Sequence, residues 1–252
     1  MKCDLHVHTH YSSDSTAVME DYCLTAIKLK LDCICFTDHV DCDPNDFGYG
    51  FYNADDYFDE FNRTKEKYGD KLTILSGMEF GEPHLYKKEF DILLKYPYDF
   101  IIGSLHWWYN HMFPSQMVAQ NVSAEDCYAN YWTEMYNMVS YGGFDCVGHF
   151  DFPKRYYKEV IYDGNVIKDI FAVMKKNKLY LEVNTSSLRR GLDENMPNYD
   201  VLKLYDGEYY TTGSDSHFAY ELYSDIDKIV LPDKQQVYYK QRGMVLTDGT
   251  KP

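Results

Sequence analysis

The chain has 252 residues, of which 45% are hydrophobic and 26% are charged, an ordinary balance for a globular protein. This length allows one large α/β domain with a sizeable core, or two small ones. The formal net charge of −15 argues against a nucleic-acid partner and against binding to an anionic membrane surface.

The first predicted element is a short strand at Cys3–Val7, where apolar and polar residues alternate. This alternation places Leu5 and Val7 on one face, and His6 and His8 on the other. Two imidazoles that leave one strand end together can bind a metal ion. An isolated pair of this kind is more often the polar edge of a surface strand, so residues elsewhere in the chain must decide.

Strands and helices then alternate along the chain. Further strands are predicted at 32–36, 72–75, 100–103, 144–147, 179–184 and 209–212, and helices at 19–29, 54–68, 85–95, 123–141, 166–176 and 199–204. Two long loops, 40–53 and 107–122, have the length of a lid or a binding loop. The last segment, 229–246, is less regular. About seven strand-then-helix units favour an α/β fold with a parallel sheet closed into a TIM-like barrel.

The remaining composition indicates an intracellular protein with an aromatic pocket. Seven cysteines form an odd set without CxxC spacing, so we expect a reducing cytoplasm and no disulfide framework. No apolar run approaches the length of a membrane span, and the first strand leaves no room for a signal peptide. Aromatic residues make up 17% of the chain, so we expect them to line the substrate pocket.

Residues that can bind metal follow six of the predicted strands, at the end where barrel active sites lie. These residues are His6, His8, His39, Glu79, His106, His149, Asp215 and His217. Each one alone is more often a hydrogen-bonded structural residue. Burying so many imidazoles and carboxylates together would carry a large desolvation cost, which two or three divalent cations would remove.

The pattern resembles the polymerase and histidinol phosphatase (PHP) family of metal-dependent phosphoesterases. The matching segments are DLHVHTH at 4–10, TDH at 37–39, GMEFGE at 77–82, GSLH at 103–106, GHFD at 148–151 and GSDSH at 213–217. They occur in the family's order and span almost the whole chain. The resemblance implies a distorted seven-stranded (β/α)7 barrel with a trinuclear metal site, and a single PHP-type phosphoesterase domain over residues 1–252.

The resemblance also implies which residues would bind each ion. The first ion would take His6, His8, Asp215 and Glu79; the second Glu79, His106 and His149; and the third Asp14, His39 and His217. Such sites accept zinc, iron or manganese. Three further histidines match no ligand position, and we expect His10, His84 and His111 on surface loops, with His84 the best candidate of the three to line the pocket.

Residues 182–189, EVNTSSLR, resemble the histidinol-phosphate phosphatase branch of the family, which has Gly where this chain has Ser187. Arg189 in this segment and Arg155 just after GHFD stand where arginines would bind a phosphate. The implied reaction is hydrolysis of a small phosphate monoester, above all L-histidinol phosphate to L-histidinol and phosphate in histidine biosynthesis. The departures at Ser187 and in GEPH at 81–84 leave the metal ligands intact but bear on the substrate.

In this reaction the metals would lower the pKa of a bound water to about 7, and Glu79 would bridge two of them. Asp151 or a water would protonate the leaving group. One alternative is a PHP phosphatase that acts on another small phosphate ester or on phosphotyrosine. Another is a non-catalytic PHP scaffold module, which the complete ligand set and the lack of an attached polymerase domain disfavour. The sequence does not indicate an oligomeric state.

Overall fold

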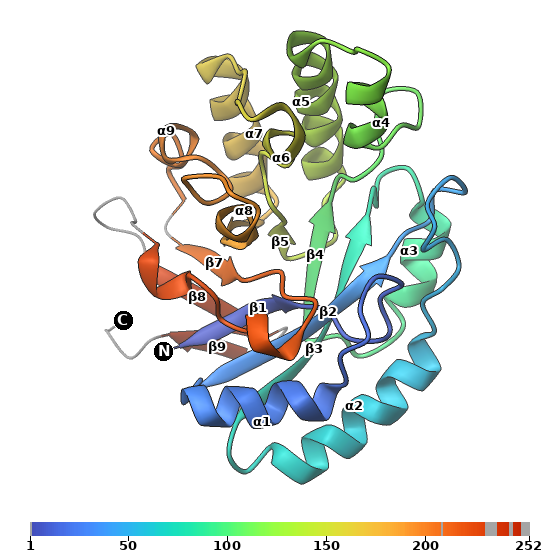
Figure 1. Ribbon diagram of the computed structural model, residues 1–252, viewed down its shortest axis with the longest axis vertical. Coiled ribbons are helices and arrows are strands. Elements are labelled where there is room, and N and C mark those ends of the chain that lie inside the picture. The colour runs from blue at the N-terminus through green and yellow to red at the C-terminus, as the bar shows by residue number, and fades with distance from the viewer. Residues whose placement is uncertain (1, 208, 230–235, 242–243, 248–252) are drawn as a thin grey trace.

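Seven parallel strands form a nearly closed barrel with helices around it (Figure 1). The computed structural model describes residues 2–207, 209–229, 236–241 and 244–247. The barrel strands are β1 (Cys3–Val7), β2 (Cys33–Val40), β3 (Thr73–Gly81), β4 (Phe100–Ser104), β5 (Cys146–Val147), β6 (Tyr180–Asn184) and β7 (Tyr209–Gly213). Each strand pairs in parallel with the next one along the chain. The distorted (β/α)7 barrel is thereby confirmed.

The barrel closes just beyond its first and last strands. The backbone N–H of Asp215 donates to the carbonyl of His6 at 2.9 Å, and that of His8 donates to the carbonyl of Ser216 at the same distance. The closure therefore brings the residues that follow β7 directly beside the histidines of β1. Two segments far apart in the sequence contribute to one site in this way.

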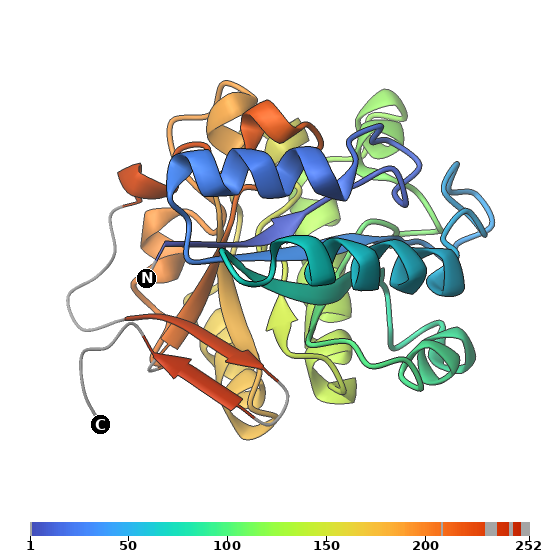
Figure 2. The same cartoon turned by 90° about the horizontal axis from the view of Figure 1, so that it is seen from below.

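The helices lie on the outside of the barrel, and Figure 2 shows α1 and α2 running along one side of it. The longer helices are α1 (Met19–Leu29), α2 (Ala54–Tyr68), α3 (Lys87–Leu93), α5 (Ala124–Tyr141) and α7 (Gly164–Lys176). Shorter ones are α4 (Pro114–Ala119), α6 (Lys154–Tyr157), α8 (Ser186–Arg189), α9 (Tyr199–Leu202), η1 (Ala219–Glu221) and η2 (Ile226–Lys228). Among the described helices, none has both the length and the apolar character to cross a membrane.

Local sequence accounts for where α2 begins and which face it buries. The side chain of Asn53 accepts hydrogen bonds from the N–H groups of Asp55 and Asp56, which would otherwise lack a partner in the first turn. Tyr57 and Phe61, one turn apart, are both buried against the core. The loop 40–53 is thus anchored where it meets this helix.

Two segments differ from the sequence prediction. The loop 107–122 contains helix α4, which starts at Pro114, a residue that the first helical turn tolerates well. The last segment forms a hairpin of β8 (Gln236–Gln241) and β9 (Met244–Thr247), visible at the barrel edge in Figure 2. Strand β8 extends the sheet in parallel beside β7, and β9 pairs with it in antiparallel fashion. Part of the predicted segment, 230–235, lies outside the described residues.

The apolar residues form two clusters, one between strands and helices and a smaller one of strand residues inside the barrel. Leu5 belongs to the inner cluster, whereas Val7 belongs to the outer one. The prediction that they share a face is therefore wrong. The pairing of β1 with β2 shifts register between Asp4 and Val7, and such a bulge interrupts the alternation of side chains.

Candidate metal centre and its cavity

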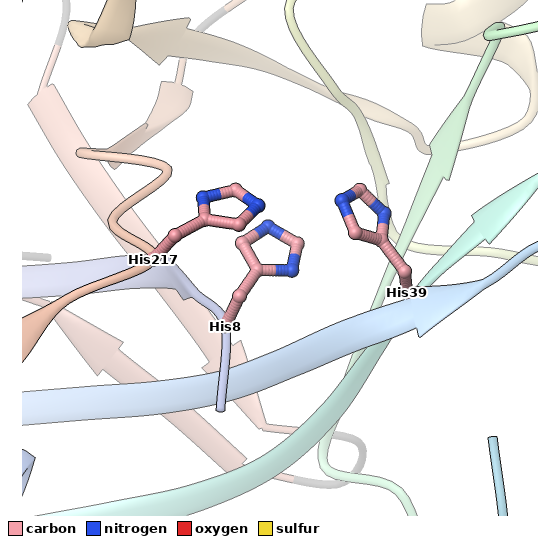
Figure 3. Close-up of side chains that lie close together, drawn as sticks. All are labelled: His8, His39 and His217. Carbon is pink, nitrogen blue, oxygen red and sulfur yellow. The ribbon is translucent and has the colours of Figure 1, made fainter. Parts of the chain in front are cut away.

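Three imidazoles meet at the carboxyl end of the barrel. Figure 3 shows His8 at the end of β1, His39 on β2 and His217 after β7 with their rings turned toward a common space. The ring centroid of His8 lies 4.2 Å from that of His39 and 4.2 Å from that of His217. One ring nitrogen from each lies within 4.8 Å of the other two, which is close enough for the three to hold one ion.

Glu79 on β3 lies at the centre of the histidine cluster with its side chain fully buried. Its Oε1 is 2.8 Å from Nε2 of His149 and 3.5 Å from Nε2 of His106. Its Oε2 is 2.9 Å from Nδ1 of His39 and 3.2 Å from Nε2 of His6. The two oxygens thus face histidines from four different strand ends, the arrangement that a bridging carboxylate requires.

Two aspartates complete the cluster. Asp215 Oδ1 lies 3.3 Å from Nε2 of His8, and Asp14 Oδ2 lies 3.0 Å from Nε2 of His217. His6, His8 and Asp215 form one group that can hold a metal ion, and His39, Glu79 and His106 form another. The structure therefore brings together all nine residues that the resemblance assigns as ligands.

Buried polar atoms without hydrogen-bond partners also indicate that the cluster can bind metal. Several buried atoms lack a hydrogen-bond partner among the described residues, and four of them lie together in the cluster: Nε2 of His6, Nε2 of His8, Nδ1 of His39 and Oε2 of Glu79. Leaving such atoms without a partner is costly, and these four point at one another rather than at separate donors. Imidazole nitrogen and carboxylate oxygen together are a donor set suited to zinc, iron or manganese.

Electrostatics favour the metal-binding protonation states of Glu79 and His8, two fully buried residues of the cluster. Burial alone would raise the pKa of Glu79, but His6, His39 and His106 hold that pKa well below its usual value. Burial, together with the nearby His39 and His217, holds the pKa of His8 well below its usual value. At neutral pH, Glu79 therefore carries a negative charge and His8 has a free lone pair.

Residues behind the histidines orient their rings. The Ser12 hydroxyl donates to Asp38 at 2.8 Å, so its oxygen accepts from Nδ1–H of His8, 3.1 Å away. Nδ1 of His106 lies 3.1 Å from the carboxylate of Asp41. A proton held on Nδ1 leaves Nε2 free to bind a metal. These supporting residues were not predicted from the sequence, although Asp38 lies within the TDH segment and Asp41 only two residues after it.

The two predicted phosphate-binding arginines differ in position. Arg155 lines the cavity, and its Nη2 lies 2.5 Å from Oδ2 of Asp215 and 2.5 Å from Oγ of Ser186. Arg189 instead donates to the backbone carbonyls of Ser214 and Asp215, at 2.6 and 3.1 Å. Its neighbour Arg190 lines the same cavity as Arg155, and the charge of Arg155 is the main reason for the lowered pKa of Arg190.

Asp151 and His84 lie away from the cavity. The carboxylate of Asp151 is buried beside the Lys154 ammonium, 3.2 Å away, and accepts the N–H of Asn198. Neither residue is among the described residues that line the cavity, so the geometry does not support Asp151 as a proton donor to the leaving group. His84 Nε2 lies 2.9 Å from Oε2 of Glu134 on α5, so the expectation that it approaches the pocket is wrong.

The other two histidines have carboxylate partners on the outer loops and helices. His10 lies 3.3 Å from Glu60 on α2. His111, whose side chain is 64% exposed, lies 2.7 Å from Asp43. This second contact joins the loops 40–53 and 107–122, as does the hydrogen bond from the Trp107 indole to Asp46 at 2.6 Å.

A cavity of about 240 Å³ opens over the cluster. Its inner wall includes His39, His106, His149, Asp215 and His217. Its outer wall is mostly aromatic and includes Asp46, Phe47, Phe113, Phe152 and Tyr156. Both long loops contribute to this wall, through Asp46 and Phe47 from the first and Phe113 from the second. Their predicted role as binding loops agrees with this placement.

Comparison with known proteins agrees with the barrel and its cluster. The PHP domain family matches residues 4–186. The chain belongs to the PHP domain family. This PHP chain is 27% identical over 230 residues to the histidinol-phosphatase of Lactococcus lactis, covering 86% of this chain and 85% of the relative. It is 26% identical over 255 residues to a probable phosphatase of Vibrio parahaemolyticus, covering 98% of this chain and 90% of the relative.

A solved structure shares the fold over nearly the full length of this PHP chain. It is the histidinol phosphate phosphatase of Lactococcus lactis, crystallised with zinc, L-histidinol and phosphate. The two structures match with a TM-score of 0.78 at 22% sequence identity, over 98% of this chain and 99% of the other.

Proposed function

We propose that this chain hydrolyses a phosphate monoester at a centre of divalent metal ions, and that L-histidinol phosphate is its substrate. The observation that carries the proposal is the position of Glu79, whose two oxygens face His6, His39, His106 and His149. Residues 1–252 would form a single phosphoesterase domain, acting in the cytoplasm in histidine biosynthesis.

We assign the nine residues to three ions. His6, His8 and Asp215 with Glu79 would hold the first, Glu79 with His106 and His149 the second, and Asp14 with His39 and His217 the third. Each set contains a short contact: 3.3 Å from His8 to Asp215, 2.8 Å from His149 to Glu79 and 3.0 Å from His217 to Asp14. The sets also adjoin one another, because His39 lies 2.9 Å from Glu79. Such ions lower the pKa of water to about 7 and neutralise phosphoryl oxygens.

The chain's own groups would bind and orient the substrate. Arg155 and Arg190 line the cavity beside the cluster, and their guanidinium groups suit the non-bridging phosphoryl oxygens. The carboxylate of Asp46 and the rings of Phe47, Phe113 and Tyr156 line the outer wall, where the leaving alcohol would lie. An acidic and aromatic wall suits a leaving group that carries both an amine and an imidazole.

The size of the cavity and the named relatives support a small substrate. A volume of about 240 Å³ lies just below the usual range for drug-sized ligands, which favours a small ester. The relatives named for histidinol phosphate favour that ester, whereas the Vibrio parahaemolyticus relative, named only as a probable phosphatase, leaves room for another one. A second phosphate ester, free phosphotyrosine included, is therefore the alternative substrate.

The experiment is a panel of phosphate esters assayed on protein of measured metal content. Histidinol phosphate should be turned over with the highest kcat/KM, ahead of phosphotyrosine and a generic aryl phosphate. Activity on the aryl phosphate without activity on histidinol phosphate would refute histidinol phosphate as the substrate, but would still support phosphatase activity. Metal-loaded protein that hydrolyses none of the panel would favour the non-catalytic scaffold. Chelated protein serves as the matched blank.

A further inference from the structure

Glu182 on β6 is a buried carboxylate that contacts two different strand ends of the cluster. Its Oε1 lies 2.6 Å from Nδ1 of His6. Its Oε2 accepts the backbone N–H of His149 at 2.7 Å and the side-chain amide of Asn184 at 3.1 Å. Glu182 thus connects a residue of the first proposed ion to a residue of the second, although it faces neither ion itself.

The contact with His6 fixes the position of one proton. An ionised carboxylate only accepts hydrogen bonds, so the short contact requires the proton of His6 to be on Nδ1. Nε2 of His6 then offers its lone pair on the side where Oε2 of Glu79 lies, 3.2 Å away. The other tautomer would place a proton on Nε2, where an ion should bind.

The contact with His149 acts on the backbone. His149 has a φ of 22°, a conformation that residues other than glycine rarely adopt. The hydrogen bond from its N–H to Glu182 helps to hold this conformation, and with it the direction of the imidazole toward Glu79. The same carboxylate therefore orients one ligand through its ring and another through its main chain.

The neighbouring strand leaves room for this carboxylate. Gly213 at the end of β7 has no side chain, and a methyl group built there would overlap both Oε1 of Glu182 and Cβ of His6. The hydrogen bond between Glu182 and His6 therefore depends on glycine at position 213.

We propose that Glu182 is a positioning residue that sets the metal affinity of the cluster, by holding the proton of His6 on Nδ1 and the main chain of His149 in place. This inference rests on the proposed function, because it takes both histidines as metal ligands. Loss of a carboxylate that orients a ligating histidine lowers metal affinity roughly 10–100-fold.

The test is Glu182→Gln, in which the side chain keeps its shape. An amide has one acceptor and one donor, so it cannot accept from both His6 and His149. In one orientation its NH₂ opposes the N–H of His149, and in the other it forces the proton of His6 onto Nε2. We expect zinc affinity, measured by competition with a chelator, to fall roughly 10–100-fold.

Asp145→Asn is the matched control. Asp145 accepts the N–H of Ile101 at 2.9 Å just before β5, at the opposite end of the barrel. This variant should lose some thermal stability and keep the zinc affinity of the wild-type protein. Equal zinc affinity in Glu182→Gln, Asp145→Asn and wild type would refute the role of Glu182.

Gly213→Ala tests the same contact while the charge of Glu182 is kept. The added methyl group should displace the carboxylate and lower zinc affinity in the same direction, so the proposal remains testable if Glu182→Gln does not fold. Wild-type affinity in Gly213→Ala would count against the proposal. A wild-type protein that binds no zinc, iron or manganese would refute the proposed function first, and this inference with it.

Discussion

Arg155 contacts the carboxylate of Asp215, a group that also belongs to the proposed metal centre. The guanidinium of Arg155 lies 2.5 Å from Oδ2 of Asp215, whereas Oδ1 of Asp215 faces Nε2 of His8 at 3.3 Å. Each oxygen of Asp215 therefore has its own task. Burial would raise the pKa of Asp215, but Arg155 and His6 hold it well below its usual value, so this carboxylate stays charged between them.

This division of oxygens predicts the effect of Arg155→Ala. The substitution should leave metal content unchanged, because Oδ1 keeps its place beside His8. It should lower kcat/KM for the phosphate ester, with a loss of transition-state stabilisation of about 2–4 kcal/mol, the range for removing one partner of a desolvated charge pair. Metal analysis and steady-state kinetics on the same preparation provide the check. Full activity in this variant would show that the guanidinium does not bind the phosphate.

Alanine substitutions of the adjacent arginines, Arg189 and Arg190, should have different effects. Arg190 lines the cavity, so Arg190→Ala should lower kcat/KM by about 1.5–3 kcal/mol at unchanged melting temperature. Arg189 holds the backbone after β7, so Arg189→Ala should lower the melting temperature. Kinetics and thermal unfolding of both variants test the assignment, and a reversed pattern would return the phosphate-binding role to Arg189.

Glu79→Gln should reduce activity more than removal of any single terminal histidine ligand, one that would bind a single ion. The neutral amide compensates less metal charge and bridges two ions poorly. We expect a loss in kcat of about 10³-fold, equivalent to about 4 kcal/mol in the barrier. His149→Ala, assayed beside it, is the comparison. Near wild-type turnover in Glu79→Gln would mean that the bridge lies elsewhere.

Removal of metal should destabilise the fold. A ligand present at a thousandfold excess over its Kd stabilises the native state by roughly 4 kcal/mol, or about 10 °C in a domain of this size. Thermal unfolding with chelator, and again after zinc is restored, measures the difference. An identical melting temperature in both conditions would contradict a metal centre built from buried ligands.

The sequence predicted the barrel and the residues of the cluster because both follow from short-range patterns. Ligand-type residues come directly after apolar strands, and parallel strands place their carboxyl ends together. Glu79 and His39 could be identified without knowing the loop conformations or the side-chain angles. The same rule identified Asp215, because the strand predicted at 209–212 comes shortly before it.

What the sequence could not supply depends on local backbone geometry. Arg189 and Arg190 are adjacent at the end of α8, yet Arg190 lines the cavity over the cluster whereas Arg189 lines an adjoining pocket. The bulge in β1 separates Leu5 from Val7 without any glycine or proline to signal it. Glu182 has an ordinary place on a buried strand, and its contact with His6 joins residues 176 positions apart.

The three proposed ions would differ in how easily they exchange with bulk solvent. The side chains of His6, His8 and Glu79 are fully buried, while those of Asp14, His39 and His217 are 36%, 16% and 15% exposed. The ion held by the latter set would leave first and return first. Partly depleted preparations should consequently contain one dominant species lacking that ion, and their activity would follow its occupancy more closely than the total metal bound.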